Sequence, residues 1–455
     1  MSSNTALLLC VLFILLVLII DWRQKSYFTP ALSVPWIWLI FSASKALSQW
    51  LNPVASPEID VTTIDYTAGN ATDRLFLLVL LVLGIMILLR RRLNWTEIIR
   101  QNLWIFIIYF YMGFSIIWSG YPSVSMKRWI RAIGDLIMVI VILTEDQPFE
   151  AIKSLFRKTT FILLPLSVLL IKYFRYIGAQ FTYEGIEMWV GVTTHKNSLG
   201  ELSLIVSLFL LLDIISPNSG KRRYLYIFFL IISQYLLYGA HSMTSVVTFV
   251  IGVIIIIVLS AVKNKLHSLQ SIFYFMPIIF IGFQLAFVLQ LSKSAKSSIF
   301  SMLGRDMTLT GRTELWQELL IIGSKHPIFG VGYGGFWIGD IHNLWSIFLW
   351  RPMLGHNGYI DVYLDLGIIG VIFLLLIIIK SYSKLVKTLI DDFEYGRMRF
   401  IFLIVIIIHD ITESSFARPT QFFWVVFLLT ALNIAPKKNM LTAESLEETV
   451  IHSNA

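Results

Sequence analysis

The chain has 455 residues, of which 57% are hydrophobic and only 14% are charged, and its mean hydropathy is +0.76. Soluble domains are about half apolar and about a quarter charged, so one water-soluble core cannot bury this many apolar runs. The formal net charge is +8, and in a membrane protein basic residues are better explained as determinants of orientation than as a nucleic-acid surface. The single cysteine, Cys10, excludes an intramolecular disulfide framework and a cysteine-based metal site.

Apolar segments that approach the thickness of a bilayer recur along most of the chain. A membrane span needs about 20 mostly apolar residues. Such segments lie near 5–20, 31–49, 74–89, 103–119, 129–144, 159–177, 198–216, 223–239, 245–262, 271–290, 359–379, 399–414 and 421–435. The second is the weakest because Ser42, Ser44 and Lys45 interrupt it, which leaves the total open at about 12 or 13. The predicted fold class is an all-α polytopic membrane protein.

Lysine and arginine gather in alternate connections, which predicts the orientation of the chain. More than half of the 36 basic residues lie near 23–25, 90–100, 153–158, 221–223, 263–265, 380–399 and 437–438. Short basic connections stay in the cytoplasm, so the longest connection, about 291–358, is expected outside. A connection of that length is uncommon unless it has a function. Within it, 313–324 has the pattern of a short amphipathic helix, with Leu315, Leu319 and Ile322 on one face.

The sharpest polar segment begins where the long outer loop meets the next span. We expect His356 at the membrane surface and Asp361 and Asp365 one or more turns deeper. Acidic residues inside a span usually pair with another group or line a polar cavity. The alternative is structural: His356 and Asn357 cap the helix, and Gly367 and its neighbour at 370 allow close packing. The segment by itself supports the two interpretations about equally.

A second polar segment lies within the loop, where Arg312 and Trp316 are followed by the glycine-rich stretch His326–Gly332. Arginine offers a fixed fork of donors that suits phosphate oxygens. The alternative is an interfacial helix anchored by Trp316, with Arg312 on lipid headgroups. No Gly-Lys-Ser/Thr follows these glycines, so nucleotide hydrolysis is not expected.

Three further polar clusters fall on the same predicted face of the membrane. They are Thr193–Glu201, which includes His195, Lys196 and Asn197; Ala240–Ser245; and His409–Ser415, which includes Glu413. Each by itself is better explained structurally, for example by Asn197 or Ser198 as a helix cap. Five polar clusters at one face nevertheless favour a functional surface, because titratable groups cluster where polar chemistry occurs.

Taken together, these segments resemble the O-antigen ligase and polysaccharide polymerase superfamily. Its ligase signature is His, then Asn, Ser or Gln, nine residues, Gly, two residues, and Gly, Thr or Tyr; His356-Asn357 with Gly367-Ile368-Ile369-Gly370 matches it fully. The segments Gly311–Trp316 and His326–Gly332 resemble the same domain. The exopolysaccharide-production branch is the most similar at Trp118-Ser119, Thr194–Asn197 and Thr412–Ser415.

The resemblance implies a many-helix glycosyltransferase of the GT-C type in the bacterial inner membrane. Its active face would be periplasmic, and its donor an oligosaccharide linked to undecaprenyl diphosphate. The other expected partners are a glycan acceptor and the lipid bilayer, with a chain-length regulator left open and no nucleic acid. No metal and no other cofactor is expected. Residues 1–190 would be N-terminal spans, 191–435 the catalytic region with the long loop, and 436–455 a polar cytoplasmic tail.

The resemblance also implies roles for individual residues. Arg312 would bind the diphosphate and His356 would act on the acceptor hydroxyl. The expected substrate-binding residues are His195, Lys196, Asn197, Asn357, Glu413 and Trp316. The ligases use a second arginine upstream of the long loop, where this chain has Met243; the substitutes considered are Lys196, Lys127, Arg128 and Arg131. Sugar stacking and membrane anchoring explain four loop aromatics equally well: Tyr333, Trp337, Trp345 and Trp350.

Three classes of function remain open at this point. The leading interpretation is a polymerase of exopolysaccharide or O-antigen, and the nearest alternative is a ligase that transfers glycan to lipid A–core or a protein. A transporter of lipid-linked sugars would show charged residues deep in the spans and often paired repeats with broken helices. A non-enzymatic scaffold or sensor would keep its function without His356.

Overall fold

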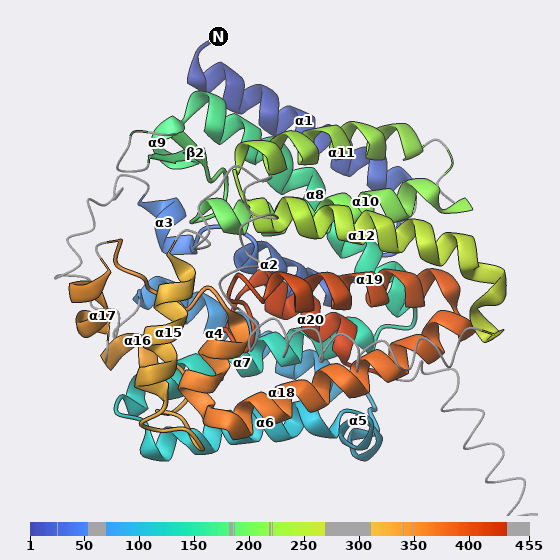
Figure 1. Ribbon diagram of the computed structural model, residues 1–455. Coiled ribbons are helices and arrows are strands. Elements are labelled where there is room, and N and C mark those ends of the chain that lie inside the picture. Colours follow the sequence, from blue (N-terminus) through green and yellow to red (C-terminus); the bar gives the residue numbers. More distant parts are fainter. Residues whose placement is uncertain are drawn as a thin grey trace, which may run out of the picture. The chain divides into compact units, whose positions relative to one another are not determined.

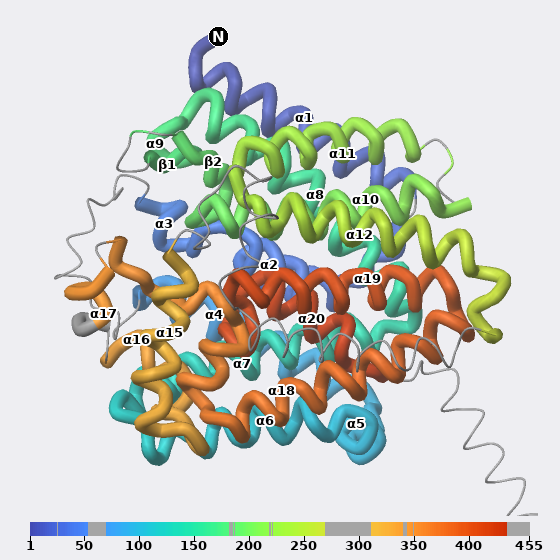
Figure 2. Tube along the Cα trace, viewed as in Figure 1, coloured from blue at the N-terminus to red at the C-terminus, as the bar shows by residue number. Residues whose placement is uncertain are grey.

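The computed structural model describes residues 1–24, 26–52, 70–181, 185, 187–217, 220, 222–268, 311–339, 341–348 and 350–434. These residues are mainly helical, which confirms the predicted all-α membrane fold (Figure 1). The expected span near 271–290, the loop residues 291–310 and the tail 436–455 lie outside the described residues. Figure 2 traces the Cα path of the described residues in colour, from blue near the N-terminus to red in the last helices.

The chain divides into two compact units. The first unit comprises Met1–Asn102, Arg131–Val253 and Thr420–Ala455, and the second unit comprises Leu103–Ile130 and Ile254–Pro419. The two units are defined by contacts between residues. The predicted regions 1–190 and 191–435 were defined by their expected roles, so the division into those regions stays a prediction. Two helices run across the unit boundaries: α7 (Pro122–Leu143) and α12 (Met243–Val262).

The first unit holds most of the helices from the N-terminal half. Its elements are α1 (Ser3–Arg23), η1 (Pro30–Leu32), α2 (Ser33–Ser42), α3 (Leu47–Leu51), α4 (Ala71–Arg90), α5 (Trp95–Gln101), α8 (Pro148–Tyr173), α9 (Arg175–Gly178), β1 (Ala179–Phe181), β2 (Glu187–Trp189), α10 (Lys196–Ile215), α11 (Arg222–Gly239) and α20 (Phe422–Ala431). The strands β1 and β2 form a small antiparallel hairpin. Helix α8 is central in this unit, since 83% of its most apolar 18-residue stretch is buried, against 11% of the corresponding stretch of α1.

Lys45, which interrupts the expected second span, has a structural explanation in the first unit. Its ammonium donates to the carbonyl oxygens of Ile177, Gly191 and Thr193 at 3.0, 3.1 and 2.7 Å. A half-buried ammonium needs acceptors of this kind to offset the loss of water. Lys45 therefore follows the end of α2 and holds the loop that leads into α10.

The second unit contains η2 and the helices of the long loop and its flanks. Its elements are α6 (Leu103–Phe114), η2 (Ser115–Trp118), η4 (Lys263–Lys265), α15 (Arg312–Gly323), α16 (Phe336–Gly339), α17 (Ile341–Ile347), α18 (Gly358–Asp391) and α19 (Phe393–His409). The predicted amphipathic helix is confirmed as α15, because Leu315 and Leu319 are buried and Ile322 packs against the same cluster. That cluster also contains Leu364, so α15 packs on α18.

Fewer helices meet a strict length and hydropathy criterion than the 12 or so expected. Among the described residues six do so, or up to seven if α5 and the helix after it count as one span. They are α1, α4, α8, α10, the helix that begins as α12 and runs over Met243–Ser268, and α18. The shorter apolar helices Pro30–Ser42 and Phe422–Ala431 fall below the length limit, and α7 carries several charged residues. A multi-pass membrane protein follows, and the larger number stays a prediction.

Helix α18 is broken at Gly367, where φ is 65° and ψ is −167°. Only glycine adopts this region of backbone conformation readily. The peptide groups freed by the break bond to the loop segment 327–332 instead. The pairs are Val331 N with Leu364 O at 3.1 Å, Gly332 N with Asp365 O at 2.9 Å and Ile368 N with Pro327 O at 2.9 Å. Such pairing is what allows an irregular backbone at membrane depth.

Candidate active site

Glu413 joins the two residues that were expected to carry the chemistry. Its Oε1 accepts a hydrogen bond from Arg312 Nη2 at 3.0 Å, and its Oε2 lies 3.2 Å from His356 Nδ1. Arg312 also donates from Nη1 to the carbonyl oxygen of Thr412. The Glu413 side chain is 5% exposed, whereas Arg312 and His356 keep 18% and 15% of their side-chain surface. We call Arg312, His356 and Glu413 the Glu413 cluster.

Local structure at the start of α15 presents Arg312 to Glu413. Gly311 precedes the helix with a φ of 80°, in the left-handed region that favours glycine, and Arg312 is the first helical residue. Trp316, one turn later, donates from its indole Nε1 to the carbonyl oxygen of Gly355 at 2.8 Å. This bond ties α15 to the residue directly before His356.

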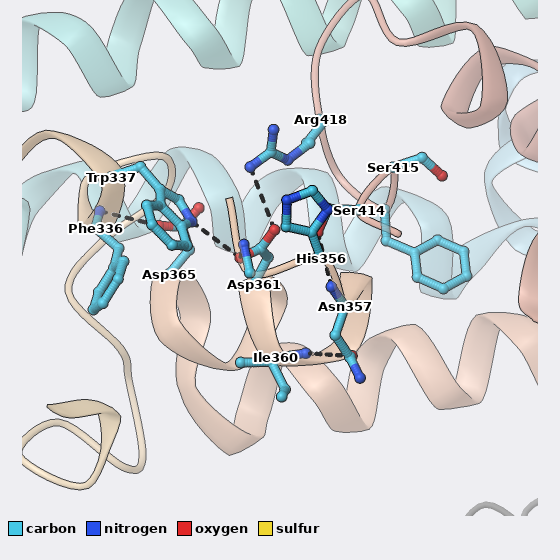
Figure 3. Close-up of polar contacts among 12 residues, drawn as sticks. Phe336, Trp337, His356, Asn357, Ile360, Asp361, Asp365, Ser414, Ser415 and Arg418 are labelled. Atoms are coloured by element: carbon cyan, nitrogen blue, oxygen red, sulfur yellow. Dashed lines mark hydrogen bonds and ion pairs between the residues drawn. The ribbon is translucent and has the colours of Figure 1, made fainter. Parts of the chain in front are cut away.

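His356 and Asn357 have different roles at the start of α18. His356 has a φ of 48°, an uncommon value for a residue with a side chain. Asn357 caps the helix, since its Oδ1 accepts from the backbone N–H groups of Tyr359 and Ile360 at 3.1 Å each. Its own N–H donates to Ser414 Oγ at 3.0 Å (Figure 3). The capping interpretation therefore describes Asn357, and its contact with substrate stays a prediction.

Asp410 organises the segment that carries Glu413. Its Oδ1 accepts from the backbone N–H groups of Ser415 and Phe416 at 2.7 and 3.0 Å, and Ser415 Oγ donates to its Oδ2 at 2.5 Å. The N–H of Gly358 lies 2.8 Å from the Asp410 carbonyl oxygen and 2.9 Å from that of Glu413. A side chain at Gly358 would lie 2.2 Å from Asp410 Oδ1. The start of α18 is thus fastened to the turn after α19.

A second carboxylate, Asp361, stands one turn along α18 from His356. Its Oδ1 accepts from Gly355 N and from Trp337 Nε1, both at 3.0 Å. Its Oδ2 lies 3.3 Å from Arg418 Nη2 (Figure 3). The sequence drew attention to Asp361 as an acidic residue within a span, and this pairing agrees with that expectation. Arg418 was not among the expected site residues, because it lies beyond the His409–Ser415 cluster.

The charge of Glu413 is set by its neighbours. Burial acts to raise the pKa of the Glu413 carboxyl, but the hydrogen bond to His356 and the positive charge of Arg312 lower it to about 2. The ionised carboxylate accepts hydrogen bonds only, so the His356 nitrogen that faces it carries the proton. In the neutral tautomer that carries its proton on Nδ1, the other ring nitrogen, Nε2, has the lone pair that can take a proton from a hydroxyl.

His195, Lys196 and Asn197 form the start of α10 in the first unit. The His195 Nδ1 accepts from the N–H of Asn197 at 3.2 Å, so His195 is the cap, rather than Asn197 or Ser198 as expected. Lys196 is the first helical residue, and Asn197 is 7% exposed. The Glu413 cluster belongs to the second unit, so a shared site with these residues stays a prediction.

The aromatic residues of the loop differ in exposure. Trp316 is 7% exposed and belongs to the core of α15, which gives it a structural role, and its expected part in substrate binding stays a prediction. Tyr333 is 2% exposed and donates to the carbonyl oxygen of Ala417 at 2.7 Å. Trp350 is 41% exposed, and its ring centroid lies 5.9 Å from that of His356. Trp350 is therefore better placed than Trp316 or Tyr333 for a sugar ring.

The basic residues considered for a second phosphate contact are spread over both units. Arg128 lies in the second unit and donates to the carbonyl oxygen of Gly334. Lys127 precedes it, whereas Arg131 and Lys196 belong to the first unit. Across the described ranges, no group of three or more His, Cys, Asp or Glu side chains is arranged to hold a metal ion.

Two comparisons with known proteins bear on this site. The family described as O-Antigen ligase matches residues 225–375, which include Arg312 and His356 but end before Glu413. The chain is also similar to the exopolysaccharide production protein ExoQ of Rhizobium meliloti (strain 1021), with 24% identity over 305 residues. The match covers 64% of this chain and 66% of that protein, just under two thirds of its length.

Proposed function

We propose that this chain belongs to the O-antigen ligase and polysaccharide polymerase superfamily and is a membrane glycosyltransferase working at the periplasmic face of a bacterial inner membrane, on the support of its similarity to the O-Antigen ligase family and to ExoQ. Its donor is a glycan linked to a polyprenyl diphosphate, and undecaprenyl is the expected lipid. The observation that carries this proposal is Glu413, whose two oxygens contact Arg312 and His356 at 3.0 and 3.2 Å.

The reaction follows from the atoms of this cluster. His356 Nε2 takes the proton of an acceptor hydroxyl, while its Nδ1–H stays bonded to the Glu413 carboxylate. The hydroxyl oxygen then bonds to the anomeric carbon of the donor sugar. The bond from that carbon to the diphosphate oxygen breaks, and the electron pair leaves with the polyprenyl diphosphate. Arg312 stabilises the developing negative charge on the phosphate oxygens.

The donor supplies the driving force for transfer. A polyprenyl diphosphate is a good leaving group, so a reaction outside the cytoplasm needs no ATP. We also propose that no metal takes part, because the arginine supplies the positive charge that a leaving diphosphate needs. Polymer formation by the purified chain should therefore continue in excess EDTA. Loss of activity in EDTA that added Mg²⁺ or Mn²⁺ restores would refute metal independence.

A polymerase is our first choice for the activity. The support is the similarity to a protein whose name refers to exopolysaccharide production, together with motifs typical of that branch. The alternative is a ligase, since the matched family is described by that activity. The two differ in the acceptor: a lipid-linked repeat unit for a polymerase, and lipid A–core or a protein for a ligase. A chain-length regulator as partner belongs to the polymerase alternative only.

A transporter of lipid-linked sugars is the rival from another class, and the break in α18 is a feature found in transporters. At Gly367, however, the freed peptide groups bond to segment 327–332 of the same unit. They are therefore occupied by protein rather than open to an ion or substrate. These hydrogen bonds favour a structural explanation of the break over a transport site.

The decisive experiment replaces His356 by alanine in cells with matched amounts of membrane protein. We expect polymer to fall about 100-fold or more and lipid-linked single repeats to accumulate, which is the usual size of a general-base contribution. His267→Ala is a matched control, because His267 is exposed and lies outside the Glu413 cluster. Full-length polymer from His356→Ala would refute the proposed role. Polymer that forms but stays on its lipid carrier would identify a ligase.

A further inference from the structure

Two arginine–carboxylate pairs lie beside His356: one contacts its ring, and the other contacts the backbone of the residue before it. One is Arg312 with Glu413, which holds the His356 ring. The other is Arg418 with Asp361, at 3.3 Å, and Asp361 also accepts from Gly355, the residue before His356. Figure 3 draws the Arg418–Asp361 contact together with the His356 ring. All of these residues belong to the second unit.

The charge of Arg418 is only partly compensated by Asp361. The carboxylate is shared among three donors, because Gly355 N and Trp337 Nε1 both bond to its Oδ1. A guanidinium group has five N–H donors, and within the described part of the chain Asp361 is the acceptor found for this one. The Arg418 side chain keeps 25% of its surface exposed, against 6% for Asp361. Its remaining donors therefore belong to a side chain that stays partly exposed.

The segment that carries Arg418 is held rigidly. The N–H of Arg418 donates to the carbonyl oxygen of Ser415 at 3.2 Å, and Ser415 is fixed in turn by Asp410. Ala417 has a φ of 55°, and its carbonyl oxygen accepts from Tyr333. An arginine whose support is fixed in advance loses little entropy when it binds an anion, which is the property of a preorganised site.

We propose that Arg418 is a second anion-binding arginine of this site, oriented by Asp361, and that its exposed N–H groups bind a phosphate oxygen of the donor. The inference rests on the proposed function for the identity of the ligand. Arg312 offers less on its own, because its two terminal nitrogens already bond to Glu413 and Thr412. The planar guanidinium of Arg418 can donate to Asp361 from one side and to a phosphate oxygen from another, so Arg312 and Arg418 could both contact the diphosphate.

The test uses the full-length chain in neutral detergent and inorganic pyrophosphate as the probe, with binding read from the shift in thermal stability. We expect Arg418→Gln to weaken pyrophosphate binding roughly 10- to 100-fold, since charge-assisted hydrogen bonds are lost. Arg418→Lys should recover part of the affinity. Asp361→Asn keeps the arginine but releases its orientation, and we expect a smaller loss. Arg351→Gln is the matched control, because Arg351 is exposed and stacks on Trp345.

The outcomes separate this inference from the proposed function. Unchanged pyrophosphate affinity in a folded Arg418→Gln, or an equal loss in Arg351→Gln, would overturn the role of Arg418. Competition between added phosphatidylglycerol and pyrophosphate in the wild type would assign the site to a bilayer headgroup and overturn the donor as ligand. If His356→Ala still makes polymer while Arg418 governs pyrophosphate binding, the anion site stands and the proposed role of His356 falls. A rise in KM for the lipid-linked donor in Arg418→Gln would support the inference further.

Discussion

At the scale of single residues, Glu413 determines what its two neighbours can do. A carboxylate beside Nδ1 favours the tautomer with its proton on that nitrogen, and in the proposed reaction Nε2 is then the atom that meets the acceptor hydroxyl. The same carboxylate orients Arg312 while taking up part of its charge. The motifs indicated each of these residues separately. Their contacts could not be predicted from neighbours along the chain, because Glu413 lies 101 residues after Arg312 and 57 residues after His356.

Glu413→Gln should abolish most of the activity across the neutral range. The amide keeps the shape but loses the charge that holds the proton on Nδ1, so we expect a loss of about 100-fold. Polymer yield at equal protein level is the measurement, and Glu413→Asp should recover part of it. Activity equal to the wild type in Glu413→Gln would show that the carboxylate does not assist His356.

The pH dependence of stability should also report this carboxylate. Its pKa is lowered to about 2 in the folded chain, from 4.5 without perturbation, so its stabilising contribution is complete above 4.5 and is lost as the pH falls through about 2. The melting temperatures of wild type and Glu413→Gln should therefore differ by a constant amount near neutral pH. The difference should shrink only in acid. A difference that disappears near pH 6 would contradict the lowered pKa.

At the scale of elements, the break in α18 explains why the signature requires its first glycine. Gly367 lies where segment 327–332 crosses the helix, and a Cβ there would lie 2.1 Å from the carbonyl oxygen of Ile328. The same crossing also explains the glycine at position 330, because a Cβ there would lie 2.4 Å from the carbonyl carbon of Asp365. Two motifs that are distant in sequence are therefore the two sides of one contact.

Gly367→Ala should prevent correct assembly of the second unit. The new side chain clashes with backbone atoms and must adopt a φ of 65°, which together cost about 2–6 kcal/mol. The measurement is the yield of folded protein from membranes, followed by polymer formation. Gly120→Ala is the control, because a Cβ there meets nothing within 4 Å. Normal yield and activity in Gly367→Ala would show that the break is not required.

At the scale of the whole molecule, orientation across the bilayer connects the site to its substrate. The basic connections are predicted to be cytoplasmic, which places the long loop and the Glu413 cluster outside. The single cysteine makes this arrangement easy to examine, because Cys10→Ser gives a cysteine-free chain. Arg351 in the loop and Arg90 at the end of α4 are both exposed and lie on opposite predicted sides.

In the cysteine-free chain, Arg351→Cys should react with a membrane-impermeant maleimide in intact spheroplasts. Arg90→Cys should react only after the membrane is opened, because positively charged connections stay in the cytoplasm. Labelling is compared between sealed and permeabilised preparations at equal expression. The reverse pattern would place the site on the cytoplasmic side and remove the basis for a polyprenyl-linked donor outside the cell.

The membrane fold and the main chemical groups could be predicted from the amino-acid order alone. Long apolar runs must form helices in lipid, because every peptide group there needs a partner within the protein. The spacing of His356, Asn357 and Gly367 carried the resemblance to the O-antigen ligase family, and local composition singled out Arg312 and Glu413. These inferences need only neighbours along the chain, which is why they could be made without coordinates.

Which of these groups contact one another became visible in the folded chain. The pairing of Glu413 with Arg312 and His356, and of Asp361 with Arg418, joins side chains from separate helices and turns. The burial of Trp316, expected to bind substrate, likewise depends on α15 packing against α18. Such contacts are set by the path of the whole chain and by competition among many buried polar groups for partners, which no local pattern encodes.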